Sequence, residues 1–137
     1  MENDKSITLD AQTGCLENAV SFIESELAAI ACPNDKQMQI ELAVEELFVN
    51  ISNYAYRNHD GSVKIKFANP SKNRVIITLA DNGTPFNPLE REEPDILKPL
   101  EEREPGGLGI FLVKRTMDNV VYKHDGEYNN ITISKSW

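Results

Sequence analysis

Residues 41–56 read ELAVEELFVNISNYAY, and the periodicity of this stretch decides how the rest of the chain is interpreted. With successive residues about 100° apart, its apolar side chains occupy one face of a helix, suited to packing on a sheet. With one residue upstream, this face consists of Ile40, Val44, Leu47, Phe48, Ile51 and Ala55. Glu46, Asn50 and Asn53 form a separate stripe bordered by apolar residues. A carboxylate so placed can take a proton from a hydroxyl group, and an amide oxygen one turn away can bind Mg2+.

A second polar segment follows the β-branched run 75–80, where residues 81–83 read Asp-Asn-Gly. The run predicts a buried strand, with Asp81 at its end. A carboxylate there can accept a hydrogen bond from the exocyclic amine of adenine. Gly83 is expected to give the turn its conformational freedom and to let the backbone approach the ring.

A third segment, residues 106–109, reads Gly-Gly-Leu-Gly and opens the helical pattern of residues 108–117. Glycines at the start of a helix allow free amide hydrogens to converge on phosphate oxygens, and the helix dipole adds a favourable field. The string lacks the full GxGxxG spacing and the Walker lysine, which disfavours a Rossmann site and a P-loop.

Each of these segments also has an ordinary structural interpretation when it is taken alone. A Glu-Asn pair four residues apart is common on surface helices, Asp-Asn-Gly is a common turn, and glycine runs punctuate loops. The hypothesis of a nucleotide pocket depends on finding all three in one chain, in this order.

Hydrophobic periodicity predicts the order strand, two helices, two strands, loop, helix, two strands. The expected elements cover about residues 6–11, 15–31, 34–56, 63–67, 75–80, 108–117, 120–124 and a last strand around 131–133. Because strands come in adjacent pairs with short turns, the pattern predicts an α+β two-layer sandwich. Its sheet should be mixed but mostly antiparallel, with helices on one face. Residues 87–105 hold four prolines and many charges and predict a mobile loop outside the core.

Composition narrows the class of protein. A chain of 137 residues that are 40% hydrophobic predicts one domain, residues 1–137. The formal net charge of -8 argues against nucleic acid binding, so a polyanion would have to be held by local amides and a metal ion. The polar start and the lack of a long apolar run predict a cytoplasmic protein without a membrane span. Cys15 and Cys32 are widely spaced and are predicted to be small buried side chains.

The segments 41–56, 81–88 (DNGTPFNP) and 106–120 (GGLGIFLVKRTMDNV) resemble the N, G1 and G2 boxes of the GHKL ATPase and kinase superfamily, which has the Bergerat fold. Within this superfamily, the chain most resembles the small anti-sigma-factor serine/threonine kinases. The resemblance implies ATP and Mg2+ as cofactors and makes residues 87–105 the mobile ATP lid.

By position, the resemblance implies that Glu46 is the general base, that Asn50 is the magnesium ligand and that Asp81 recognises adenine. Other cofactor-binding residues predicted with it are Asn53, Gly83, Phe86, Gly106, Gly107, Leu108, Gly109 and Asn130.

Three features depart from the pattern of the resembled family. Asn53 and Tyr54 stand where related proteins often carry a basic residue, and Asn130 stands where the final strand usually supplies a threonine near the base. Residues 89–105 hold seven acidic and three basic side chains. These departures bear on catalytic efficiency more than on nucleotide binding.

Three functions are compatible with the sequence. The first is a protein serine/threonine kinase that binds a sigma factor and phosphorylates a STAS-type anti-sigma antagonist, with a homodimer implied by the resemblance. The second is a nucleotide-binding module that acts by sequestering a partner without efficient phosphotransfer. The third is a detached histidine-kinase catalytic domain, which is disfavoured because the chain begins with its own strand and helix rather than with a phosphoacceptor histidine helix.

Overall fold

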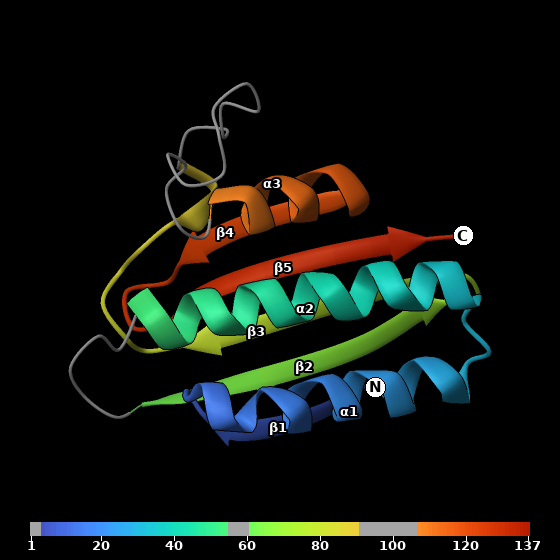
Figure 1. Ribbon diagram of the computed structural model, residues 1–137, viewed down its shortest axis with the longest axis horizontal. Coiled ribbons are helices and arrows are strands. Elements are labelled where there is room, and N and C mark those ends of the chain that lie inside the picture. The colour runs from blue at the N-terminus through green and yellow to red at the C-terminus, as the bar shows by residue number, and fades with distance from the viewer. Residues whose placement is uncertain (1–3, 55–60, 91–106) are drawn as a thin grey trace.

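The computed structural model describes residues 4–54, 61–90 and 107–137, which form two layers (Figure 1). The helices α1 (Leu16–Ala29), α2 (Asn34–Tyr54) and α3 (Gly107–Thr116) cover one face of a five-stranded sheet. The strands are β1 (Lys5–Asp10), β2 (Ser62–Ser71), β3 (Arg74–Asp81), β4 (Asn119–His124) and β5 (Asn129–Ser136). They lie in the order β1-β2-β3-β5-β4, and every described pair of neighbours is antiparallel. The predicted two-layer α+β architecture is confirmed.

The strands form because apolar and polar side chains alternate along them. In β2, Val63, Ile65 and Phe67 are buried while the intervening lysines are exposed. The register places Ile65 opposite Leu79, and Leu79 in turn opposite Ile131. Residues directly opposite one another share a face, so these side chains form a continuous apolar surface beneath the helices.

Helix α2 lies across this surface with the apolar face that its periodicity predicts. Its buried residues on that face are Ile40, Val44, Leu47, Phe48 and Ile51, whereas Ala55 lies outside the described residues. Packing of this face fixes the rotation of α2 about its axis. Of the polar stripe, Asn50 is therefore buried and Glu46 half-buried between α2 and its neighbours, whereas Asn53 is exposed.

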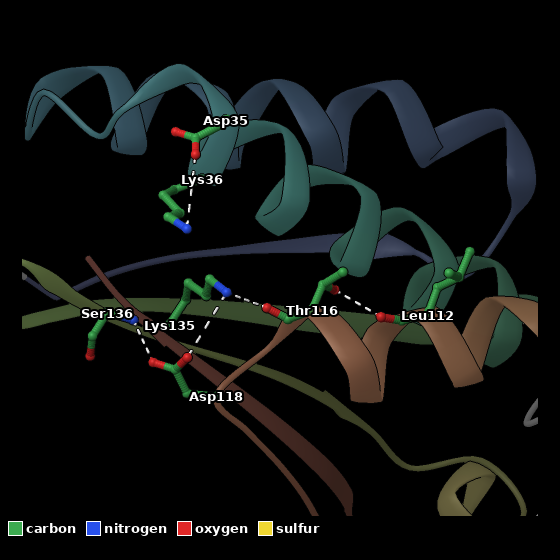
Figure 2. A network of polar contacts seen from close by, with 7 residues as sticks. All are labelled: Asp35, Lys36, Leu112, Thr116, Asp118, Lys135 and Ser136. Carbon is green, nitrogen blue, oxygen red and sulfur yellow. Dashed lines mark hydrogen bonds and ion pairs between the residues drawn. The ribbon is translucent and has the colours of Figure 1, made fainter.

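Helix α3 is anchored at its C-terminal end by a polar network shown in Figure 2. The ammonium group of Lys135 on β5 donates to the carbonyl oxygen of Thr116, the last residue of α3. It also lies 3.9 Å from Asp118 Oδ1, while Asp118 Oδ2 accepts from the Ser136 backbone N–H at 2.7 Å. A cation at a helix C-terminus interacts favourably with the helix dipole. This contact fixes α3 at one end and leaves its glycine-rich start to face α2.

The segment predicted as a mobile loop, residues 87–105, is only partly described. Its first residues form a short 3-10 helix, η2 (Pro88–Glu90), in which Pro88 is buried and Leu89 packs against the core. The Asn87 side chain accepts a hydrogen bond from the Leu89 backbone N–H at 2.9 Å. The prediction that the whole segment lies outside the core is therefore wrong at its start, because local capping lets Pro88 and Leu89 pack. Residues 91–105 lie outside the described residues.

Two simpler expectations concern the cysteines and the membrane. Cys32 is buried and Cys15 is half-buried, and both carry free thiols. No helix in the described ranges combines the length and the apolar character that crossing a bilayer requires.

Candidate functional site

Asp81 ends β3 as a buried carboxylate. Asp81 is only 3% exposed. Its Oδ1 accepts hydrogen bonds from the Gly83 backbone N–H and from the Asn129 side-chain amide, both at 3.0 Å. Burial raises the pKa of Asp81, while the two hydrogen bonds and nearby His124 act in the opposite direction. The hydrogen bonds described at this carboxylate all fall on Oδ1, so Oδ2 is the oxygen that it offers to a ligand.

A pocket opens beside Asp81 and draws its walls from four parts of the chain. Helix α2 contributes Leu47, Asn50 and Ile51; the segment after β3 contributes Thr84, Phe86 and Pro88; β4 and β5 contribute Tyr122, Asn129 and Ile131. Most of these walls are apolar, and a few polar groups are concentrated near Asp81. This composition suits a flat heteroaromatic ring that needs a small number of placed hydrogen bonds.

Glu46 lies one helical turn before Asn50, against the first turn of α3. A Cβ atom at position 109 would lie 2.0 Å from Glu46 Oε2 and 2.7 Å from Glu46 Cδ. The carboxylate therefore occupies space that is available only because residue 109 is glycine. Burial raises the pKa of Glu46, and the neighbouring charge of Glu45 raises it further. The structure thus places a carboxylate with increased proton affinity beside the N-terminal turn of a helix.

The structure corrects the prediction for Asn130. Asn129, not Asn130, is directly opposite Asp81 in the register of β3 and β5, and facing residues share one side of the sheet. The Asn130 amide lies on the other face and donates to Asp125 Oδ2 at 3.4 Å and to the Tyr128 carbonyl at 3.3 Å. Successive residues of a strand point to opposite faces of the sheet, so a shift of one residue exchanges the faces.

Asn129 and Tyr122 are among the pocket residues that the sequence did not predict as site residues. The signal for Asn129 was available, because it lies two residues before Ile131 and therefore belongs to the same buried face. The Tyr122 hydroxyl donates to Asn129 Oδ1. Tyr122 carried no comparable signal, since its position depends on the pairing of β4 with β5.

The remaining predicted contacts have different outcomes. Phe86 lines the pocket as expected, whereas Asn53 is exposed and does not line it. Gly83 contributes through its backbone, and the conformational freedom expected of it is not used: the described glycine with positive φ is Gly126, at 95°. The carboxylate of Asp81 closes this turn instead.

The glycine-rich turn is only partly described. Gly107 begins α3 and Gly109 lies in its first turn. Gly106 and the side chain of Leu108 lie outside the described residues.

Fold and pocket together define a two-layer α+β domain in which helices on one face of the sheet border a pocket. Residues 9–135 match the model of the histidine kinase-like ATPase domain, and the chain belongs to this family.

Named relatives and one solved structure extend this assignment. The chain is 37% identical over 90 residues to the serine-protein kinase RsbW of Bacillus thuringiensis (strain Al Hakam), and 36% identical over 90 residues to that of Bacillus anthracis (strain CDC 684). Each match covers 63% of this chain and 56% of the relative, so the chain spans little more than half the length of these proteins. The RsbU and RsbW domains of a Mycobacterium tuberculosis protein superpose with a TM-score of 0.70 at 16% identity, over 97% of this chain and 32% of that one. At this identity, the likeness shows the fold.

Proposed function

We propose that this protein binds ATP and acts as a protein serine/threonine kinase on a STAS-type anti-sigma antagonist, and that it also binds a sigma factor. The relatives named serine-protein kinase support the reaction class. The observation that carries the proposal is the position of the Glu46 carboxylate against the first turn of α3. One turn further along α2, Asn50 lines the same pocket as Asp81, whereas Glu46 is not among the residues that line this pocket and lies against α3. We propose that Asn50 joins the two parts of one site.

We propose an adenine ring as the ligand of this pocket. Asp81 Oδ2 can accept from the exocyclic amine, which is the hydrogen-bond donor on the adenine edge. Apolar walls from Ile51, Phe86 and Ile131 can cover the faces of the ring. We propose Asp81 as the group that selects the base.

We propose that phosphates and a metal ion bind at the other end of the site. The N-terminal turn of α3 offers backbone N–H groups and the positive end of a helix dipole, which suit an anion. The described residues contain no group of three or more His, Cys, Asp or Glu side chains that could hold a metal ion alone. Asn50 could therefore serve as a protein ligand for Mg2+ only if phosphate oxygens and water complete the coordination, as Mg2+ prefers. When bound, Mg2+ would neutralise phosphate charge.

In the proposed reaction, Glu46 accepts the proton of the attacking serine hydroxyl. The serine oxygen forms a bond to the γ-phosphorus, the bond from this phosphorus to the β–γ bridging oxygen breaks, and ADP leaves. The raised pKa of Glu46 suits a proton acceptor that works near neutral pH. The position beside α3 brings it near the helix end that we assign to the phosphates.

Incubation with ATP, Mg2+ and a STAS-type antagonist tests the proposal. We expect transfer of the γ-phosphoryl group to a serine of the antagonist, seen by mass spectrometry and phosphoamino acid analysis. Acid-labile phosphohistidine would instead indicate a histidine kinase. Tight ATP binding without any transfer would contradict the kinase assignment.

A binding module without efficient phosphotransfer is the second candidate, and one observation favours it. No Lys or Arg lines the pocket in the part of the chain that the structure describes, and Asn53 stands exposed at the end of α2. Charge neutralisation would then be weaker than in an efficient kinase.

The proposal includes a homodimer. The face of the sheet opposite the helices carries a strip of uncharged side chains beside the exposed Lys64 and Lys66 of β2, and Val121 on β4 is 56% exposed. The uncharged residues of this strip are Ala68, Ile76, Thr78 and Thr132, all of them half-buried. An uncovered surface of this kind suits burial against a second copy, and sedimentation equilibrium is the measurement that decides it.

Gly109→Ala should lower phosphotransfer without destabilising the fold. The new methyl group would displace the flexible end of Glu46 from its position 2.0 Å away, and we expect about a 10- to 100-fold slower transfer because the proton acceptor is misplaced. Alanine in place of glycine favours a helix by up to about 1 kcal/mol, so the melting temperature should stay level or rise.

Gly14→Ala is the matched control for Gly109→Ala, because a Cβ atom at position 14 meets no atom within 4 Å. It should leave transfer and melting temperature close to those of the parent. Normal transfer by the Gly109→Ala variant would show that the contact between Glu46 and α3 does not serve the reaction.

A further inference from the structure

A chain of hydrogen bonds connects two strands to the carboxylate of Asp81. The Tyr122 hydroxyl on β4 donates to Asn129 Oδ1 on β5. Asn129 Nδ2 donates to Asp81 Oδ1 at 3.0 Å, and it lies 3.3 Å from the carbonyl oxygens of Gly83 and Thr84. These hydrogen bonds therefore connect β4 through β5 to the end of β3 and to the segment that follows it.

The surroundings of the Asn129 side chain permit one orientation of its amide. Its NH2 group faces three acceptors, namely a carboxylate oxygen and two carbonyl oxygens, and its oxygen faces the hydroxyl group of Tyr122. Reversing the amide would put its oxygen against three other oxygens, which is unfavourable. The backbone N–H of Phe86 also donates a hydrogen bond to the Tyr122 hydroxyl. This contact connects Tyr122 to a residue of the pocket wall.

This arrangement determines which oxygen of Asp81 is presented to a ligand. Asn129 and the Gly83 N–H both donate to Oδ1, and these two hydrogen bonds restrain the position of that oxygen. His124, at the end of β4, also acts on Asp81 electrostatically, but its Nδ1 accepts from the Gly126 N–H at 3.2 Å and is directed into the turn. Among the side chains that the structure describes, Asn129 is therefore the one that hydrogen bonds to Asp81.

We infer that Tyr122 and Asn129 are positioning residues that hold Asp81 Oδ2 toward the 6-amino group of the base and so set the selectivity of the pocket for 6-aminopurine nucleotides. This inference rests on the proposed function, which places adenine against Asp81. Asn129 contacts Asp81 directly, and Tyr122 acts through Asn129. Neither residue needs to contact phosphate.

The test compares ATP with purine riboside triphosphate, which lacks only the 6-amino group. Binding is measured by isothermal titration calorimetry for the parent, Tyr122→Phe and Asn129→Leu. The parent should prefer ATP by about 10- to 100-fold, because a buried carboxylate loses a partner with the analogue. Tyr122→Phe should reduce this ratio by roughly 5- to 10-fold, and Asn129→Leu should bring it close to one, mainly by weakening ATP binding.

Two matched variants control for changes elsewhere. Asn130→Leu alters the adjacent residue on the opposite face of β5, and Tyr128→Phe removes a hydroxyl from a residue that is 40% exposed. Both should keep the parent ratio. Tyr122→Phe keeps every ring carbon, so it decides the question if Asn129→Leu fails to fold.

The outcomes separate this inference from the function on which it rests. If Tyr122→Phe and Asn129→Leu lower the affinity for both nucleotides equally, Tyr122 and Asn129 only support the pocket wall. That result would overturn the inference and leave the proposal of ATP binding intact. Equal affinity of the parent for the two nucleotides would overturn it as well, because Asp81 would then not read the amine. A parent that binds neither nucleotide would overturn the proposed function and this inference together.

Discussion

Asp81→Asn should reduce the affinity for ATP by at least about 100-fold, which is roughly 2.7 kcal/mol, while the protein stays folded. The amide oxygen of asparagine can still accept from the Gly83 N–H and from Asn129, so the turn is retained. Its NH2 group would replace Oδ2 and oppose the adenine amine, donor against donor. The buried amine would lose its partner, and leaving a buried polar group unpaired is costly. Isothermal titration calorimetry with ATP measures the loss.

The stability of Asp81→Asn should stay level or rise although its affinity for ATP falls. Burial raises the pKa of Asp81, so the folded state holds this proton more tightly than the unfolded state does. The stabilisation from the protonated carboxyl is complete below the unfolded pKa and is lost as the pH rises through the raised folded pKa. Asparagine never ionises, so at neutral pH the variant should melt no lower than the parent. The difference should narrow in acid, as thermal unfolding across pH would show.

Asp125→Asn is the matched control for Asp81→Asn, because the pKa of Asp125 shifts the other way. Backbone N–H groups of Tyr128 and Glu127 donate to Asp125 Oδ1 at 2.7 and 3.0 Å and lower its pKa. The stability that this exposed carboxylate contributes is present above its unfolded pKa and is lost as the pH falls through the lowered folded pKa. Asp125→Asn should therefore lower the melting temperature slightly at neutral pH and leave ATP affinity within about twofold. A loss of ATP affinity in Asp81→Asn that came with a large fall in melting temperature would mark Asp81 as structural only.

The elements of this fold follow from local patterns, whereas their pairing does not. The period of α2 predicted its buried face, and alternation predicted the buried residues of β2. Nothing local indicates that β5 inserts between β3 and β4, because that order depends on contacts between distant residues. The prediction of Asn130 as a binding residue differs from the structure for this reason: placing it requires the register of β5 against β3, and a one-residue error exchanges the two faces.

The candidate site is likewise predicted from the sequence only in part. Periodicity in α2 placed Glu46 and Asn50 on a stripe that is bordered by apolar residues, and the strand pattern placed Asp81 at the end of β3. The contact of Glu46 with position 109 depends on how α2 and α3 pack, and that packing involves anchorage of α3 by Lys135 at its other end. The packed start of the segment after Phe86 was missed because its composition resembles that of a loop.

Glu46→Gln should separate nucleotide binding from phosphotransfer. Glutamine has nearly the same shape and can occupy the space beside Gly109, but it cannot accept a proton at neutral pH. We expect transfer to the antagonist to fall by about 10²- to 10⁴-fold, the contribution typical of general base catalysis, while ATP affinity stays within about threefold. Single-turnover assays with labelled ATP measure transfer, and calorimetry measures binding.

Glu45→Gln removes the same charge from the adjacent residue of α2 and serves as the control. The carboxylate of Glu45 acts on Glu46 only through its charge, so this variant should keep transfer within a few-fold of the parent. The pH profile adds an independent readout. Because burial and Glu45 raise the pKa of Glu46, transfer by the parent should rise with pH through a midpoint above the usual range of glutamate, and Glu45→Gln should move this midpoint slightly lower.

The Glu46→Gln variant should lose this rise, because no carboxylate then titrates at the position. If it instead transfers phosphate at the parent rate with an unchanged profile, Glu46 is not the proton acceptor. If antagonist control in cells survives the loss of transfer, partner binding alone accounts for the regulation, and the binding module becomes the better description. If regulation requires phosphotransfer, Glu46→Gln should abolish control of the antagonist, because Glu46 is the residue that we propose as the proton acceptor.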